Sequence, residues 1–80
     1  MEKEKVLSEV GEICKNVFGN TDLNITYDTA AKDVQNWDSM TNLFLIDSIE
    51  SKYGIKFSLD EIMNAKNIGD LCDVIVRKTA

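Results

Sequence analysis

The chain has 80 residues, enough for one small domain but not for two cores, because chains of this length bury only about 60% of their unfolded surface. With 44% hydrophobic residues, 29% charged residues and no proline, the composition is that of a globular, helix-rich domain. The net charge of −5 would be repelled by nucleic-acid phosphates and anionic lipids. We therefore expect a single domain over residues 1–80 that does not bind nucleic acid.

The first element predicted along the chain is an amphipathic helix over residues 3–18. Its apolar residues recur at steps of three and four, and Gly19 with Asn20 ends the pattern. The segment contains no uninterrupted apolar run, so we expect neither a signal peptide nor a membrane-spanning helix. The resulting expectation is a cytoplasmic protein without stable membrane insertion.

The two cysteines, Cys14 and Cys72, fall at apolar positions of helical patterns. Small buried thiols in a reducing compartment explain them better than a disulfide does. The chain has no histidine and no CxxC pair, so the usual zinc ligand set is missing and we expect no metal site.

Residues 21–37 form a long connection without a sustained hydrophobic period. Loops of this length are uncommon in small domains, and we expect this one to be pinned by its isolated apolar side chains. These are Leu23, Ile25, Tyr27, Val34 and Trp37.

A second helix is predicted over residues 39–53, with Asp38 as its N-cap and Gly54 at its end. The stripe expected to face the core contains Met40, Leu43, Ile46, Ile49 and Tyr53. Phe44 and Leu45 cannot both be centrally buried on such a helix, so we expect at least one of them to be partly exposed. An alternative for Phe44 is that it tucks against the loop near Trp37, and Trp37 itself is expected to pack around residues 40–43.

Two further helices follow. Ser58 and Glu61 have the spacing of a capping box, which predicts a short helix to about Ala65. Asn67 is a suitable cap for a last helix, whose inner face would carry Ile68, Leu71, Cys72 and Ile75. The predicted fold is all-α: a bundle of four helices, three long and one short, with a long loop between the first and the second.

The residues do not support a self-sufficient enzyme. Ser39 has no histidine in the chain to act as its base, and the adjacent Asp60 and Glu61 point in different directions on a helix. There is no glycine-rich phosphate loop and no calcium-loop spacing of carboxylates. From local sequence alone, Asp38 and Ser39 are simply a good helix start.

Four short motifs together have a more specific meaning: DSM at 38–40, YGIKF at 53–57, SLDE at 58–61 and NIGDL at 67–71. In this order and spacing, over the whole chain, they resemble the acyl carrier protein family. The resemblance implies the four-helix carrier fold, with 4′-phosphopantetheine attached to Ser39 from coenzyme A by a separate transferase. It also implies that Asp38 helps to place the magnesium ion in the transferase complex.

The missing histidine is expected on this interpretation, because the serine hydroxyl is the substrate of another enzyme. The resemblance implies a non-catalytic carrier of thioester-bound acyl intermediates for fatty-acid, lipid or polyketide-like biosynthesis. Its partners would be the phosphopantetheinyl transferase and acyl ligases, synthases and transferases. A longer acyl chain would fold back between the helices, parting the stripe of Met40, Leu43 and Ile46 from Leu71.

The second helix departs from the family in having few acidic residues. Thr41 and Phe44 stand where acids are common, which indicates a specialised carrier rather than the abundant carrier of fatty-acid synthesis. The residues expected to bind partner enzymes are Met40, Thr41, Phe44, Asp47, Glu50, Asp60 and Glu61.

Two other functions stay open at this point. One is an aminoacyl or peptidyl carrier, since the loading enzyme chooses the cargo. The other is a helical interaction module in which Asp38 and Ser39 only cap a helix. We expect a monomer, because no second apolar face of the size of an obligate interface is apparent.

Overall fold

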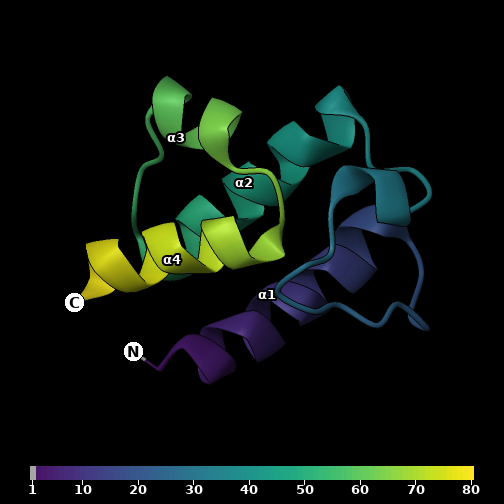
Figure 1. Cartoon of the computed structure of the whole chain (residues 1–80), viewed down its shortest axis with the longest axis horizontal. Coiled ribbons are helices and arrows are strands. Elements are labelled where there is room, and N and C mark those ends of the chain that lie inside the picture. Colours follow the sequence, from purple (N-terminus) through teal and green to yellow (C-terminus); the bar gives the residue numbers. More distant parts are fainter. Residues whose placement is uncertain (1) are drawn as a thin grey trace.

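The computed structural model describes residues 2–80, which contain helices and no strand. The helices are α1 (Lys3–Phe18), α2 (Ser39–Tyr53), α3 (Leu59–Asn64) and α4 (Ile68–Thr79), and a 3₁₀ turn, η1 (Ala31–Asp33), lies in the long loop. The predicted all-α architecture of three long helices and one short one is confirmed, although η1 was not foreseen (Figure 1).

The predicted helix ends are also confirmed. Gly19 and Gly54 adopt the left-handed conformation, with φ of 67° and 66°, and close α1 and α2. Asp38, Ser58 and Asn67 each accept backbone N–H groups of the helix that they begin, and Ser58 and Glu61 form the capping box. These signals are local, so the sequence is sufficient to place them.

The core lies between α1, α2 and α4. α1 packs against both other long helices, and Figure 1 shows α3 set apart from α1, beyond α4. Among the residues of 2–80, the fully buried side chains come from these three helices: Val6, Val10, Cys14, Leu45, Ile49, Ile68, Cys72 and Ile75. α3 contributes no fully buried residue, but Ile62 packs against the core, and polar contacts at the ends of the helix add to this.

The expected inner stripe of α2 is partly wrong. Ile46 and Ile49 are buried, but Met40 and Leu43 are 66% and 61% exposed. At about 100° per residue, Met40 and Ile49 lie on opposite sides of the helix, because they are nine residues apart. Residues that are spaced three apart along a helix therefore turn gradually from its core face to its solvent face.

Phe44 and Leu45 behave as their adjacency requires. Leu45 is fully buried and Phe44 is 58% exposed, which confirms that one of the two must face solvent. The alternative in which Phe44 tucks against the loop is wrong, because Trp37 instead packs on Phe18, with ring centroids 5.3 Å apart. α2 therefore has apolar residues on both its inner and its outer face.

The long loop is pinned as expected. Val34 is buried, and the other four isolated apolar side chains are half-buried against the core. Trp37 reaches α2 within the predicted segment, because its Nε1 donates to Oδ1 of Asn42 at 3.0 Å. The loop also contacts α4, since the N–H groups of Ile68 and Gly69 donate to the carbonyl oxygens of Thr29 and Tyr27, both at 2.8 Å.

Cys14 and Cys72 are buried free thiols, as predicted. Burial raises the pKa of Cys14 to about 12 and that of Cys72 to about 11. Neither thiol is therefore a reactive nucleophile near neutral pH.

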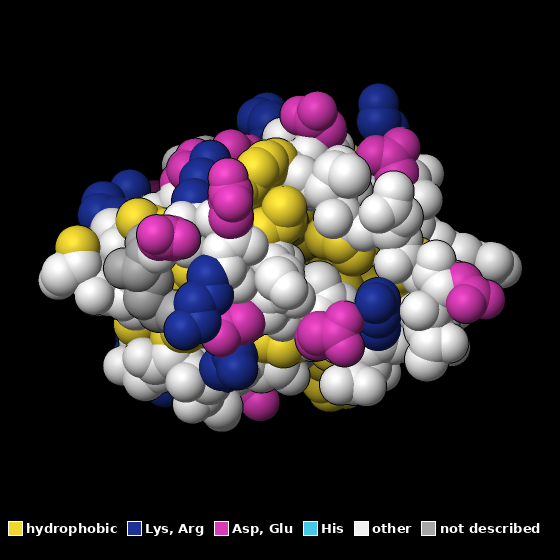
Figure 2. All heavy atoms as spheres, turned by 90° about the horizontal axis from the view of Figure 1, so that it is seen from below, with side chains coloured by type: hydrophobic (Ala, Val, Ile, Leu, Met, Phe, Trp, Pro, Cys, Tyr) yellow, Lys and Arg dark blue, Asp and Glu magenta, His cyan; other side chains and the backbone are white. Residues whose placement is uncertain are grey.

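Two properties of the surface bear on function. No helix within residues 2–80 is long and apolar enough to cross a membrane. Figure 2 views the molecule from the side on which α1 lies, and acidic and basic side chains are interspersed there with hydrophobic atoms between them. Because charges of both signs are mixed on this face, its electrostatic field does not mark it as a binding site.

Candidate functional site

Ser39 is the first residue of α2 and its side chain is exposed. The preceding residue, Asp38, is extended and turns its carboxylate back onto the helix, where Oδ1 accepts the N–H groups of Met40 and Thr41 at 3.0 Å each. The hydrogen bond from the Thr41 amide is the largest cause that holds the pKa of Asp38 below its usual value. The carboxylate thus fixes the helix turn that presents Ser39.

Thr41 fixes the same turn from the other side. Its Oγ1 accepts the N–H of Asp38 at 2.8 Å and donates to the carbonyl oxygen of Asn36 at 2.6 Å. Asn36 has φ of 73°, a left-handed conformation that asparagine adopts more readily than most residues. The chain is therefore held on both sides of Ser39.

The chemistry available to Ser39 is limited by its surroundings. Among residues 2–80 no side chain is hydrogen-bonded to its hydroxyl, and the chain has no histidine that could act as a base. The N–H groups of the first turn of α2 and the positive end of the helix dipole stabilise an anion there by about 0.3 to 1 kcal/mol. This arrangement suits a hydroxyl that another enzyme modifies with a phosphate group.

A pocket of about 290 Å³ opens beside Ser39. It is formed by the end of the long loop, the first turns of α2, α3 and the start of α4. Its lining residues are Ala31, Trp37, Asp38, Ser39, Asn42, Ile62, Ala65, Lys66, Asn67 and Leu71. Of the expected acyl-binding residues only Leu71 lines it, so the part assigned to Met40 and Leu43 is wrong, because those side chains are exposed to solvent and do not line the pocket.

The sequence did not reveal Asn42, Lys66 and Asn67 as pocket residues. Asn67 carried only a capping signal, and neither Asn42 nor Lys66 belongs to a motif. Their convergence depends on how α2, α3 and α4 pack, which no local pattern encodes.

The residues expected to bind partners fall into two groups. The first group is exposed and consists of Met40, Phe44, Asp47 and Asp60. The side-chain oxygens of Thr41, Glu50 and Glu61 instead accept internal N–H groups. For Glu50 the donor is the N–H of Phe57, at 2.8 Å.

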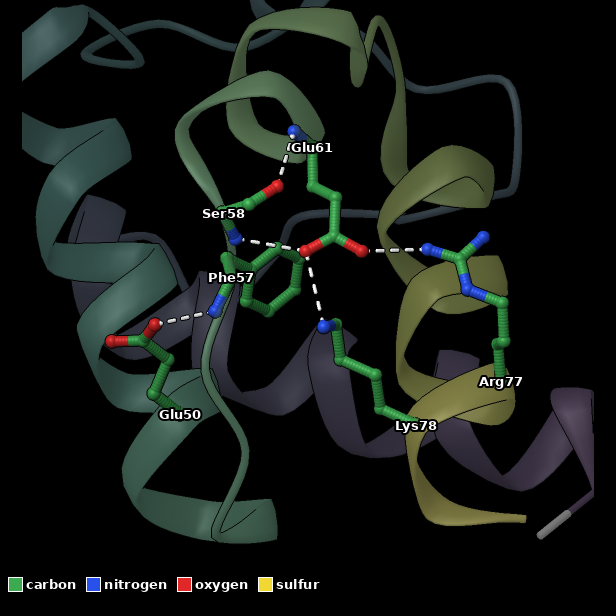
Figure 3. A network of polar contacts seen from close by, with 6 residues as sticks. All are labelled: Glu50, Phe57, Ser58, Glu61, Arg77 and Lys78. Atoms are coloured by element: carbon green, nitrogen blue, oxygen red, sulfur yellow. Dashed lines mark hydrogen bonds and ion pairs between the residues drawn. The ribbon is translucent and has the colours of Figure 1, made fainter.

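Glu61 is the centre of the polar network in Figure 3. Its carboxylate accepts the N–H of Ser58 at 2.8 Å and pairs with Arg77 at 2.7 Å and Lys78 at 3.2 Å. The Ser58 N–H, followed by the two cations, lowers the pKa of Glu61 to about 2. This network attaches the start of α3 to the end of α4. Glu50 of α2 holds Phe57, the residue before Ser58, through the Phe57 N–H.

Exposed apolar side chains gather on α2 and α3. Those of α2 follow Ser39 within two turns, and those of α3 lie one turn apart on the outer side of that helix. They are Met40, Leu43, Phe44, Leu59 and Met63, each at least 58% exposed.

The exposed Ser39 thus lies on the first turn of α2 beside a pocket, in a chain that has no histidine to activate it. The family model described as "Phosphopantetheine attachment site" matches residues 8–75. The chain belongs to this family, whose prosthetic group is phosphopantetheine.

Relatives and a solved structure agree with this assignment. The chain is 32% identical to the acyl carrier protein of Exiguobacterium sibiricum over 94% of this chain and 95% of that one. It is 28% identical to the acyl carrier protein of Acidothermus cellulolyticus over 99% and 94%. The solution structure of the holo acyl carrier protein from Geobacter metallireducens matches with a TM-score of 0.85 and 39% identity, over 90% and 83% of the two chains.

Proposed function

We propose that this protein carries acyl groups as thioesters on a 4′-phosphopantetheine arm attached to Ser39, in fatty-acid, lipid or polyketide-like biosynthesis. The observation that supports this best is the exposed hydroxyl of Ser39 on the first turn of α2, held in place by Asp38 and Thr41 and lacking any base of its own. The thiol at the end of the arm supplies the thioester chemistry.

Attachment requires a transferase that brings the base. The Oγ of Ser39 forms a bond to the phosphorus that carries the pantetheine half of coenzyme A. The bond from that phosphorus to the bridging oxygen breaks, and adenosine bisphosphate leaves with this oxygen. The serine proton passes to the transferase. The first-turn N–H groups of α2 then lie beside the phosphodiester anion.

Asp38 has two separate tasks in this proposal. Its Oδ1 caps α2, while Oδ2 accepts no hydrogen bond among residues 2–80 and is free to approach the magnesium ion in the transferase complex. Carboxylate oxygens are ligands that magnesium prefers.

Partner enzymes would bind around Ser39 through the exposed members of the predicted set, Met40, Phe44, Asp47 and Asp60. Residues 39–46 carry no charge, so the contact nearest the arm is apolar, and the acidic contacts lie further away. The chain itself would be non-catalytic, acting as one monomeric carrier domain over residues 1–80. An apolar partner surface fits a carrier that serves a dedicated set of enzymes.

The test is the intact mass before and after incubation with coenzyme A, magnesium and a broad-specificity phosphopantetheinyl transferase. We expect a gain of one phosphopantetheinyl group in the wild type and in Ser51→Ala, an exposed serine on the same helix, and no gain in Ser39→Ala. Absence of any gain with several transferases would leave Ser39 as part of a helix start and favour an interaction module.

A further inference from the structure

The pocket beside Ser39 is lined by three side chains that can donate hydrogen bonds, those of Asn42, Lys66 and Asn67. We propose that it selects an acyl group that carries a neutral oxygen, a hydroxyl or keto group, close to the thioester, rather than a plain alkyl chain. The inference rests on the proposed carrier function and concerns the chain's own residues Asn42, Lys66 and Asn67.

The orientation of the Asn42 amide is fixed by chemistry. The indole Nε1 of Trp37 can only donate a hydrogen bond, so the atom of Asn42 that faces it at 3.0 Å must be the carbonyl oxygen. The NH₂ group of Asn42 is consequently on the other side of the amide. Within residues 2–80 it has no protein acceptor, although the residue is half-buried and lines the pocket.

The same reasoning applies to Asn67. Its Oδ1 accepts the backbone N–H of Asp70 at 2.9 Å as the cap of α4, which again leaves the NH₂ group as a donor. The ammonium group of Lys66 forms no ion pair with the part of the chain described here. Three side chains from α2 and the α3–α4 connection therefore bring donors to one pocket.

Acceptors are scarcer around this pocket. The carbonyl oxygens of Asn42 and Asn67 are already engaged, and Asp38 uses Oδ1 to cap α2, which leaves its Oδ2 as the free side-chain carboxylate oxygen at the pocket. A hydroxyl or keto oxygen on the cargo would satisfy a donor that otherwise needs water. The charged side chains that line the pocket are one cation, Lys66, and one anion, Asp38, so their net charge gives no preference for a carboxylate.

The size of the pocket indicates a short cargo. Its volume of about 290 Å³ is bounded on the inner side by closely packed residues. Leu71 forms part of its wall and is 3% exposed, while Leu45 and Ile46 on the inner face of α2 are closely packed. A long alkyl chain would have to displace this core, whereas a four-carbon acyl group would not.

The experiment compares cargoes of equal length on the intact protein. The protein is loaded by a transferase from butyryl-, 3-hydroxybutyryl- and acetoacetyl-coenzyme A, and from coenzyme A alone. Loading is checked by intact mass. The readouts are the side-chain amide NMR signals of Asn42 and Asn67, with exposed Asn64 as the internal reference, and the fluorescence of the chain's one tryptophan, Trp37.

We expect the hydroxyl and keto cargoes to shift the Asn42 and Asn67 amide signals beyond their positions with the bare arm, while butyryl does not. With the hydroxyl and keto cargoes, Lys66→Met should reduce the shift of the Asn42 and Asn67 amide signals. Asn42→Ala should abolish the cargo-dependent change in Trp37 fluorescence. Asn64→Ala should change neither readout. If the bare arm shifted the Asn42 and Asn67 signals as much as the hydroxyl and keto cargoes do, the donors would be binding the amide oxygens of the arm itself. This result would overturn the inference. Larger shifts with butyryl would also overturn it. In both cases the mass gain would still support the carrier function, whereas absence of loading would overturn both.

Discussion

The backbone N–H of Gly69 donates to the carbonyl oxygen of Tyr27 at 2.8 Å, so the long loop closes the first turn of α4. The loop comes this close because residue 69 has no side chain: a Cβ there would lie 2.9 Å from that oxygen and 3.2 Å from the Cβ of Tyr27. The loop is thus attached to the bundle by backbone contacts as well as by its apolar side chains.

Gly69→Ala should therefore destabilise the protein. The added methyl group forces Tyr27 and α4 apart, which weakens the hydrogen bonds of Ile68 and Gly69 to the loop, each contributing about 0.5 to 1.5 kcal/mol. We expect the free energy of unfolding in urea to fall by about 1 to 3 kcal/mol.

Gly11→Ala is the matched control, because a Cβ at this buried helix position would make an ordinary 3.7 Å contact with Ile25. Alanine favours the helix interior by roughly 0.5 to 1 kcal/mol, so this variant should be at least as stable as the wild type. A Gly69→Ala protein as stable as Gly11→Ala would show that the close approach is not important.

Glu61→Gln should make the protein less stable at neutral pH, and the difference should depend on pH. The pKa of Glu61 is about 2 in the folded protein and near 4.5 when unfolded, so the unfolded state binds the proton more tightly. The stability that the carboxylate provides is therefore present above about pH 4.5 and lost as the pH falls toward 2.

The measurement is the urea midpoint of wild type and Glu61→Gln between about pH 7 and pH 2. The two midpoints should converge at the acid end. Asp60→Asn removes an exposed neighbouring carboxylate that forms no ion pair within residues 2–80, and its midpoint should follow the wild type. A gap between wild type and Glu61→Gln that stayed constant down to pH 2 would contradict the role of the ionised network.

The capping half of this network could be predicted from the sequence and the ion-pair half could not. Ser58 and Glu61 are three residues apart, so a helix start alone brings them together, and the same is true of Asp38 with Thr41. Arg77 is sixteen residues from Glu61 and meets it only after α3 and α4 have packed. Long-range contacts of this kind have no local pattern.

The outer face of α2 was harder to predict for a different reason. Because apolar residues occur on both sides of the helix, hydrophobic periodicity does not define a single stripe, and the core face had to be chosen between Leu43 and Leu45. The site itself was predictable at Ser39 and Asp38, which belong to a short motif. The pocket was not, because Asn42 and Lys66 meet only through tertiary packing.

Phe44→Ala should separate partner binding from stability. Phe44 is 58% exposed, so its truncation should change the free energy of unfolding by no more than about 0.5 kcal/mol. Loading of Ser39 by a transferase should nevertheless slow, mainly through a higher KM for the protein, because an exposed apolar contact about one and a half turns from the serine is lost. Both quantities can be measured on one preparation, by urea unfolding and by a loading time course.

Leu45→Ala is the control on the neighbouring position. Leu45 is fully buried, and removing it should cost about 2 to 5 kcal/mol of stability. If the folded fraction of this variant is loaded at the normal rate, the effect of Phe44→Ala belongs to the surface contact. An unchanged KM in Phe44→Ala would remove Phe44 from the partner surface.

Substitutions of Asp38 should distinguish its capping role from its proposed support of magnesium. Asparagine retains an Oδ1 that can accept the N–H groups of Met40 and Thr41, so Asp38→Asn should keep the stability of the wild type to within a few tenths of a kcal/mol. Asp38→Ala loses both hydrogen bonds and should cost about 0.5 to 2 kcal/mol. If the carboxylate approaches the metal, both variants should be loaded slowly, and raising the magnesium concentration should partly restore loading of Asp38→Asn. Normal loading of Asp38→Asn, together with slow loading of Asp38→Ala, would instead assign Asp38 to the helix cap alone, since only the hydrogen-bonding oxygen would then be needed.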